Sequence, residues 1–349
     1  LSRGFSSNKH RESVKNLIRK PSFLFICLLI ITTTTILVLR ISLTSASNLN
    51  LNVNTDSSIY SPGSLVIVSG NATLDEEPIT DGLVGIEILD PNLSPFFFRT
   101  LKTGEGTQVG WIRILDAYTS DNVGNPKTRF RAGNPVYVTI TVENMGPNLE
   151  TIVVTVSLLD HGLQPLGISL SICSIPSQNS LIFTFSIPLP EWAANGSASA
   201  FISLFTDFPG EGGVPYCEEK PVTFQIESPN IEIPPQISPN NTSSMFTMQM
   251  KIPKEDIKLG NYTLCYSMGY QGLQSYGKTI FKVTITGDID GDGKVNYKDL
   301  FLLAAAYGSS QGEERYNRSA DLNSDGKINY QDLFLLAANY GMIFGGGGD

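Results

Sequence analysis

The chain has 349 residues, enough for two or three domains, and its 32 glycines and 20 prolines favour strands and turns over a helical core. Seven basic residues and one acid lie within residues 1–40, which leaves 17 basic and 32 acidic residues, a net charge of −15, in the rest. A surface this acidic argues against nucleic acid as a partner.

Residues 21–43 are predicted to direct export. The uncharged residues 21–39 follow a basic segment, residues 1–20, that we expect to stay in the cytoplasm. Nineteen helical residues approach the roughly 30 Å hydrocarbon core of a bilayer. One prediction is therefore an uncleaved transmembrane helix over 21–43 that anchors the protein in the membrane. The alternative is a cleaved signal sequence with its site near residues 45–47. Both place the later residues outside the cytoplasm, at the cell surface or secreted.

Residues 48–107 alternate apolar and polar side chains between turn signals, which predicts β-strands. This stretch resembles the first half of a macroglobulin-like or carboxypeptidase-regulatory-like β-sandwich, but it lacks the closing strands. Strand patterns that could close it appear much later, across residues 245–286. We therefore predict that residues 48–107 and 229–286 share one sandwich.

Residues 108–228 separate these halves, and their strand pattern resembles a cell-adhesion-related sandwich of archaeal or bacterial surface proteins. We predict that this sandwich is inserted into a loop of the other, since loop-closure entropy grows slowly with loop length. Three sandwiches in tandem are the alternative, although two of them would have only about 60 residues each. The predicted fold class is mainly β: Ig-like sandwiches, one inserted in the other, plus a small helical calcium module and an N-terminal transmembrane helix.

Cysteines and glycosylation sequons fit export. Outside the cytoplasm, a disulfide between Cys173 and Cys217 is predicted, with Cys265 as a buried thiol. Asn-x-Ser/Thr sequons occur at Asn71, Asn92, Asn195, Asn240, Asn241, Asn261 and Asn317. This density is typical of an exported glycoprotein.

Near the C-terminus, residues 288–308 and 321–341 agree at 15 of 21 positions and form a duplication. Each copy begins with a 12-residue loop of the EF-hand type, whose oxygen ligands at fixed positions can surround a calcium ion. Gly293 and Gly326 stand where such a loop turns sharply. Val295 and Ile328 are predicted to pair the two loops with each other. The predicted ligands of two Ca²⁺ ions are Asp288, Asp290, Asp292, the Lys294 carbonyl, Asn296 and Asp299 in loop one, and Asp321, Asn323, Asp325, the Lys327 carbonyl, Asn329 and Asp332 in loop two.

A helix pattern follows each loop. Leu300, Leu303, Ala304 and Tyr307 recur at helical spacing, which predicts one apolar face toward the core. Gly308 and Gly341 stand where C-terminal caps belong.

Loop plus exiting helix, duplicated and with Asp at position 12, resembles the type I dockerin module, over residues 287–341. The resemblance implies two calcium ions and docking onto a cohesin-like protein domain, often in polysaccharide breakdown. The chain lacks the Ser-Thr and late basic pairs of many such modules. We expect partner contacts from exposed residues of the two copies: Tyr297, Lys298 and Phe301, and Tyr330, Gln331 and Phe334.

No catalytic constellation is apparent, because the two histidines, His10 and His161, accompany no nucleophile motif. Glu105, Asp116 and Asp121 could in principle supply a glycosidase carboxylate pair, but we interpret them as solvated loop acids. Trp111 and Trp192 are candidates for stacking on a surface glycan. The sequence thus predicts a non-enzymatic, calcium-dependent adhesion or assembly protein at the cell surface. The alternative is an accessory protein of polysaccharide degradation docked on a cohesin-bearing scaffold.

Overall fold

The computed structural model of the chain describes residues 47–104, 110–230, 245–323 and 325–343. The predicted membrane or signal segment, residues 21–43, and the basic residues 1–20 lie outside the described residues. Within the described ranges, no helix is long and apolar enough to cross a membrane.

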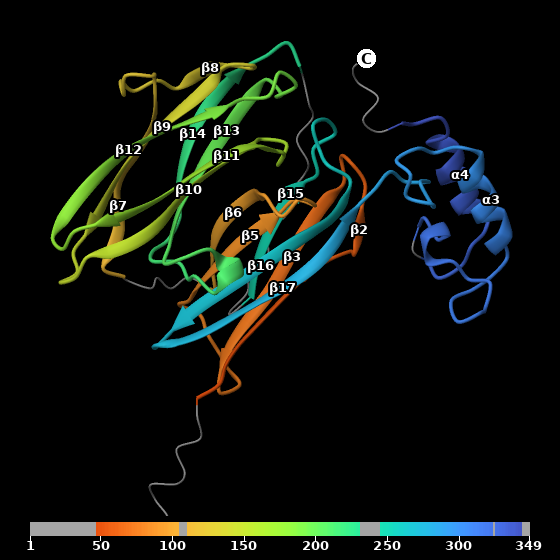
Figure 1. The fold of residues 1–349 in the computed structure, drawn as a ribbon, viewed down its shortest axis with the longest axis horizontal. Helices are drawn as coiled ribbons and strands as arrows, with labels where there is room; N and C mark the ends of the chain where they lie inside the picture. The colour runs from red at the N-terminus through yellow and green to blue at the C-terminus, as the bar shows by residue number, and fades with distance from the viewer. Residues whose placement is uncertain (1–46, 105–109, 231–244, 324, 344–349) are drawn as a thin grey trace, which may run out of the picture. The chain divides into compact units, whose positions relative to one another are not determined.

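The described chain is mainly β, with four sheets and two short α-helices (Figure 1). Two sheets combine strands from both sides of residues 112–227. In chain order the first contains β1 (Leu49–Thr55), β3 (Leu65–Leu74), β4 (Glu77–Pro78) and β15 (Met245–Lys251), and the second contains β2 (Ile59–Tyr60), β5 (Leu83–Leu89), β6 (Pro95–Lys102), β16 (Gly260–Tyr270) and β17 (Leu273–Val283).

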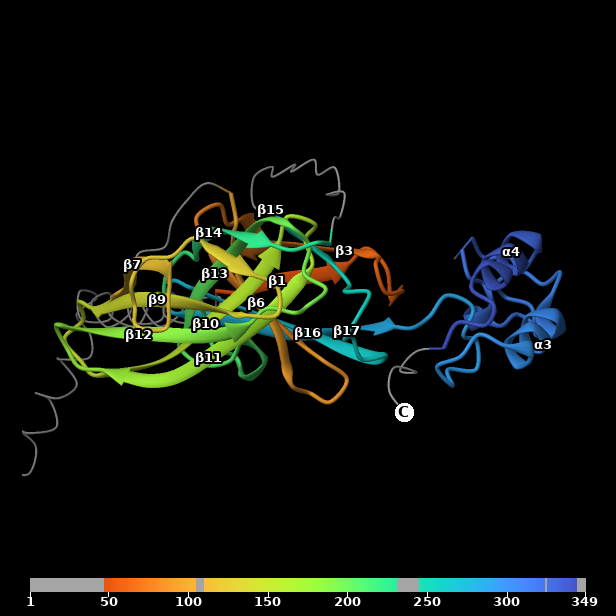
Figure 2. The same ribbon diagram turned by 90° about the horizontal axis from the view of Figure 1, so that it is seen from above.

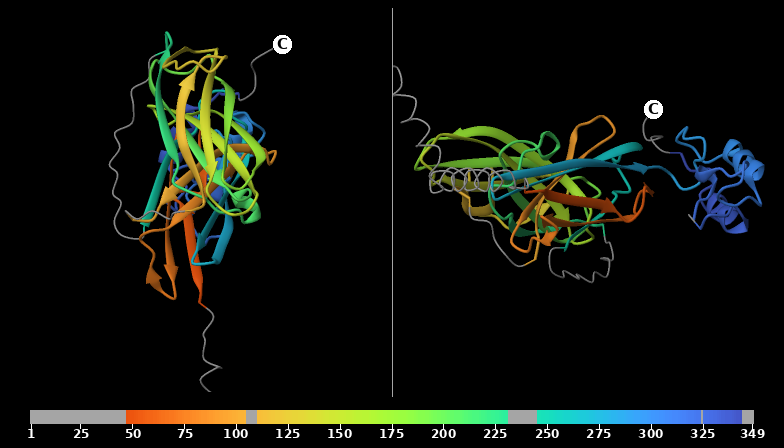
Figure 3. Two further views of the ribbon diagram at one scale, coloured as in Figure 1. Left: turned by 90° about the vertical axis from the view of Figure 1, so that its left-hand side faces the viewer. Right: turned by 90° about the horizontal axis from the view of Figure 1, so that it is seen from below.

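The register ties the early and late strands directly together. β15 runs antiparallel to β3, with Met248 opposite Val68, and β16 runs antiparallel to β5, with Leu264 opposite Ile88. Figure 3 shows the early strands (orange) and the late strands (blue) from two further sides. Alternate side chains of these strands are buried in one apolar core, as expected for sheets with one face turned inward.

The other two sheets come entirely from the intervening residues, and they enclose a second apolar core. One is β12–β9–β7 and the other is β11–β10–β13–β14–β8. Their bounds are β7 (Ile112–Ser120), β8 (Arg129–Arg131), β9 (Pro135–Asn144), β10 (Glu150–Asp160), β11 (Pro165–Ile175), β12 (Asn179–Pro188), β13 (Gly196–Phe205) and β14 (Lys220–Glu227), with a 3₁₀ turn η1 (Pro209–Glu211) after β13.

Asn144 organises the connection from β9 to β10. Its buried side-chain amide donates to the carbonyls of Asn148 at 2.7 Å and Ile175 at 2.9 Å, and its carbonyl accepts from Gly146 N at 2.8 Å. One side chain thereby satisfies three backbone groups that the turn would otherwise leave unpaired.

The predicted disulfide is wrong. Cys173 and Cys217 are both free and half-buried. Cys173 lies on β11, whereas the segment before Cys217 pairs with the opposite side of β13, so that β10 and β13 lie between them. Strands are spaced about 4.8 Å apart, so this separation exceeds the roughly 7 Å Cα–Cα limit of a disulfide. Cys265 is a buried free thiol, as predicted.

Residues 285–343 contain two copies of one loop–helix unit, with α3 (Tyr297–Ala306) and α4 (Tyr330–Ala338) side by side (Figure 2). A 3₁₀ turn, η2 (Arg318–Ala320), precedes the second loop. Their small core contains Val295 and Ile328 from the loops and Leu303 and Leu336 from the helices. No helix precedes loop one; β17 and a short turn lead directly into it.

Candidate calcium and docking site

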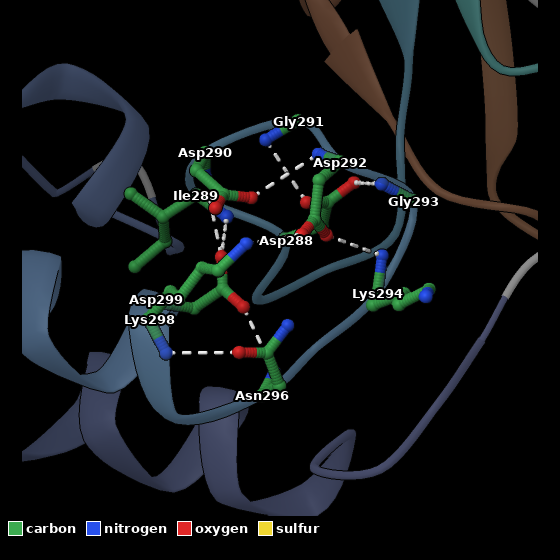
Figure 4. A network of polar contacts seen from close by, with 10 residues as sticks. All are labelled: Asp288, Ile289, Asp290, Gly291, Asp292, Gly293, Lys294, Asn296, Lys298 and Asp299. Carbon is green, nitrogen blue, oxygen red and sulfur yellow. Dashed lines mark hydrogen bonds and ion pairs between the residues drawn. The ribbon is translucent and has the colours of Figure 1, made fainter.

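Loop one draws three carboxylates together. One oxygen from each of Asp288, Asp290 and Asp292 lies within 4.8 Å of the others. Figure 4 shows how backbone N–H groups hold them. Gly291 N donates to Asp288 Oδ1 at 2.9 Å, and Gly293 N donates to Asp288 Oδ2 at 3.1 Å. Gly293 has φ +80°, a conformation that a side chain with a Cβ rarely adopts.

Asp299, at position 12, holds the loop to its helix. Its Oδ1 accepts from Ile289 N at 2.7 Å and Asp290 N at 3.2 Å, and its Oδ2 accepts from Asn296 N at 2.8 Å. The Asn296 side chain in turn accepts from Lys298 N and completes a capping box for α3. Asp299 is fully buried, so position 12 acts here as the link between the loop and the helix.

Loop two repeats this arrangement. Asp332 accepts from Leu322 N at 2.7 Å, Asn323 N at 3.3 Å and Asn329 N at 2.8 Å. Gly326, with φ +81°, donates to Asp321 Oδ2 at 2.9 Å.

Tyr316 is a site residue that the repeat pattern did not reveal. Its hydroxyl donates to Asp321 Oδ2 at 2.7 Å and thereby fixes the first position of loop two. The equivalent position in the first copy, 33 residues earlier, is Val283, so a comparison of the copies gives no signal for it.

Electrostatics in loop one favour a bound cation. Burial raises the pKa of the Asp288 carboxyl, the N–H of Gly293 opposes that effect, and the charges of Asp299 and Asp292 add to it. A divalent cation relieves such repulsion. The side-chain donors are oxygen atoms, which suit a hard cation, and a 12-residue loop with glycine at position 6 suits calcium. The residues present therefore fit Ca²⁺.

The predicted helix face is wrong. Of Leu300, Leu303, Ala304 and Tyr307, only Leu303 is buried. The buried positions of α3 are Asp299, Leu303 and Ala306, because the loop residues fill most of the small core and leave the helix a narrow inward stripe.

The predicted partner residues lie on the outside of both helices. Phe301 is 71% exposed and Phe334 is 69% exposed, with Tyr297 and Tyr330 close to 60%. Tyr297 packs edge-on against Phe301 at 6.4 Å between ring centroids, and Tyr330 packs against Phe334 in the same way at 6.1 Å. Lys298 and Gln331 are also exposed.

Comparison with known proteins gives one family match. The family model described as "Dockerin type I domain" matches residues 286–339. Residues 286–339 are a dockerin type I domain. No curated protein sequence matches the chain.

Solved structures resemble parts of the chain only weakly. The C-terminal domain of wzt shows a TM-score of 0.31 at 11% identity, covering 38% of this chain and 86% of that one. The DNA glycosylase AlkC of Pseudomonas fluorescens shows 0.26 at 8% identity (35% and 32%), and a cycloisomaltooligosaccharide glucanotransferase of Paenibacillus sp. shows 0.23 at 18% identity (31% and 13%). The chain thus spans about a third or less of the two enzymes, and such low scores establish no shared fold.

Proposed function

We propose that the protein is an exported surface protein that assembles with a protein partner, through its dockerin domain and in a calcium-dependent way. The observation that carries this proposal is the pair of matching Tyr–Phe contacts, exposed at equivalent places on both copies. Large aromatic side chains dominate the energy of protein interfaces, and here they have no role in the domain's own core. A cohesin-like domain is the partner that the dockerin match favours.

Each loop would hold one Ca²⁺ through the predicted ligands, from Asp288 to Asp299 and from Asp321 to Asp332. Calcium binding would stabilise the loop–helix geometry that presents the aromatic residues, since an ion that binds only the folded state adds to its stability.

Residues 49–102 and 245–283 would form one β-sandwich, with residues 112–227 inserted as a second. The shared sheets β1–β3–β15 and β2–β17–β16–β5–β6 and the two separate cores support this division. The sandwiches would carry the dockerin domain away from the cell, with residues 21–43 as membrane anchor or signal sequence.

No catalytic role is proposed. Asp121 accepts from the backbone N–H groups of Val123 and Asn125 and from the Asn125 amide, so it caps a turn. Trp192 donates from Nε1 to Asp256 Oδ2 at 2.8 Å, which engages its polar edge within the protein. Trp111 is exposed and remains the candidate for contact with a glycan.

The second candidate function is that of an accessory protein in polysaccharide degradation, and the dockerin match is the observation that favours it. The two functions differ in what the partner carries: adhesion requires surface proteins, whereas degradation requires a cohesin-bearing scaffold that also holds glycosidases.

Affinity capture from a surface extract of the source organism, in calcium and in EGTA, tests the proposal. We expect a protein with a cohesin-like domain to be retained in calcium and released by EGTA. Replacing Tyr297, Phe301, Tyr330 and Phe334 by alanine should abolish retention while calcium binding persists. Retention that persists in EGTA, or that persists after all four alanine substitutions, would contradict the proposed docking surface.

A further inference from the structure

The middle of loop one pairs with the segment after α4. Val295 N donates to Met342 O at 2.9 Å, and Gly341 N donates to Val295 O at 2.8 Å. Lys294 and Ile343 form an antiparallel bridge beside this pair. The predicted pairing of Val295 with Ile328 is therefore wrong, because each residue uses its backbone groups elsewhere.

Loop two shows the reciprocal arrangement with the segment after α3. Ile328 N donates to Ser309 O at 2.9 Å, Gly308 N donates to Ile328 O at 2.8 Å, and Ser310 bridges Lys327. Gln311 N adds a bond to Gly326 O at 2.8 Å. The segment that follows the helix of one copy thus forms backbone hydrogen bonds with the loop of the other copy.

These bonds reach the predicted backbone ligand of each calcium site. The N–H of Val295 and the C=O of Lys294 belong to one planar peptide group and point in opposite directions. Fixing the N–H on Met342 therefore fixes the direction of the Lys294 carbonyl. The same holds for Ile328, Ser309 and the Lys327 carbonyl in loop two.

We infer that residues 341–343 position the Lys294 carbonyl for calcium in loop one, as residues 308–311 position the Lys327 carbonyl in loop two. This inference rests on the proposed calcium function. The two supports differ in burial: Ser309 is 1% exposed, whereas Met342 is 49% exposed. Loop one depends on the more exposed support. Removal of that support should weaken calcium binding by loop one and leave loop two unaffected.

Truncation of the full chain separates the two sites. Chains ending at Tyr340 and at Ile343 differ only in the supporting segment, and the longer one is the matched control. Each chain is made in two versions. In one, Asp325→Ala disables loop two, so that only calcium binding by loop one is measured. In the other, Asp292→Ala disables loop one, so that only calcium binding by loop two is measured. Calorimetric titration with CaCl₂ gives the affinity of the remaining site.

With Asp325→Ala, ending the chain at Tyr340 should weaken calcium binding about 10-fold to 100-fold, the range typical of lost outer support for a metal ligand. With Asp292→Ala, the same truncation should change binding less than about twofold, which also shows that the shortened domain is folded. Hydrogen exchange should show faster exchange at Val295 N and unchanged exchange at Ile328 N.

Equal affinities of the two Asp325→Ala chains would overturn the inference, and so would an equal loss in both backgrounds. Failure of the proposed function looks different, because the unaltered full chain would then bind no calcium at all.

Discussion

At the residue scale, Asp90 ties the turn between β5 and β6 to a distant part of the chain. Its Oδ1 accepts from Asn92 N at 2.8 Å and Ser94 N at 3.0 Å, and its Oδ2 accepts from Lys258 Nζ at 2.5 Å. Partial burial acts to raise the pKa of Asp90, but the bonds from Lys258, Ser94 and Asn92 outweigh it and hold the pKa below its ordinary value.

Asp90 should therefore stabilise its sandwich at neutral pH. A carboxyl with a lowered pKa in the folded state contributes fully above its unfolded pKa, and the contribution disappears as pH falls through the folded value. Asp90→Ala should lower the free energy of unfolding by about 1.5–3 kcal/mol at pH 7, and the difference from the unaltered chain should shrink below about pH 4. Hydrogen exchange at the β5 and β6 amides measures it.

The control is Lys258→Met, which removes the ion pair but leaves both backbone bonds of the turn. It should have a smaller effect than Asp90→Ala. A difference between Asp90→Ala and the unaltered chain that is constant from pH 7 to pH 3 would contradict the role of the ionised carboxylate.

The two calcium loops differ at two charged positions: loop one has Asp290 and Lys298 where loop two has Asn323 and Gln331. Lys298 Nζ lies 3.3 Å from Asp292 Oδ2, and although desolvation acts to raise the pKa of Asp292, the bond from Lys298 keeps it low. The equivalent residue in loop two is Gln331, which accepts from the Asn323 amide at 3.4 Å. Lys298 would thus compete with a bound calcium ion for Asp292.

Exchanging these residues should shift the two affinities in opposite directions. We expect Lys298→Gln to tighten calcium binding in loop one about twofold to fivefold, and Gln331→Lys to weaken loop two by a similar factor, as befits exposed charges. Calorimetric titration with the other loop disabled measures each change in calcium affinity. Both changes should be smaller in 0.5 M NaCl. Shifts of the same sign in both loops would reject the competition.

At the scale of elements, helix amphipathicity predicted two helices but not their inward faces. An apolar stripe in α3 was expected at Leu300, Leu303, Ala304 and Tyr307, yet only Leu303 faces the core. The reason is domain size: a core of about eight buried side chains, several of them from the loops, cannot cover two apolar helix faces. The surplus apolar side chains form the exposed surface.

The two loops of the dockerin domain could be predicted directly from the sequence, because their acidic residues and glycine occupy fixed positions in one short segment. The reciprocal support of the loops could not, because Val295 and Gly341 meet only through tertiary structure and are 46 residues apart. The sequence likewise gave no means to place Cys173 relative to Cys217, since strand order in a sheet is a non-local property.

Neighbouring apolar residues of α3 should therefore behave differently on substitution. Leu303→Ala removes a buried side chain and should lower the free energy of unfolding of the calcium-loaded dockerin domain by about 2–4 kcal/mol. Phe301→Ala should change it by less than about 0.5 kcal/mol, because Phe301 is exposed. Hydrogen exchange at α3 amides in saturating calcium measures both changes in the free energy of unfolding. A large loss of stability with Phe301→Ala would show that Phe301 packs in the core.

At the scale of the whole molecule, the proposed inserted sandwich (the insert, residues 112–227) packs against the proposed sandwich that carries it (the host, residues 49–102 and 245–283). Phe98 of β6 and Phe205 of β13 are fully buried against each other, with ring centroids 6.1 Å apart. Arg99 of the host forms a bidentate pair with Glu219 of the insert, at 2.6 and 2.8 Å. Ser267 donates to Gly213 O across the same boundary.

A buried carboxylate also belongs to this boundary. Glu87 of β5 accepts from Gly210 N of η1 at 2.8 Å. Burial raises its pKa, the Gly210 bond and Lys278 oppose that effect, and Glu211 and Asp207 add to it. Such a contact resists relative motion, because separation would leave the Gly210 N–H and the apolar rings without partners.

Separation of the insert from the host should leave both folded. Residues 108–228 expressed alone should fold, because they enclose their own core. Joining residue 107 to residue 229 through a short linker should leave a folded host, but one that exposes Phe98 and therefore self-associates. Sedimentation velocity should show concentration-dependent dimers or larger species.

Phe97 and Phe98 supply the matched pair for this experiment, since they are adjacent and face opposite sides of β6: Phe97 lies in the host core and Phe98 at the boundary. In the joined host, Phe98→Ser should restore a monomer and keep the fold, whereas Phe97→Ser should unfold it. In the intact chain both substitutions should be destabilising, because both rings are then buried. An unfolded joined host, together with residues 48–107 that fold alone, would instead establish sandwiches in tandem.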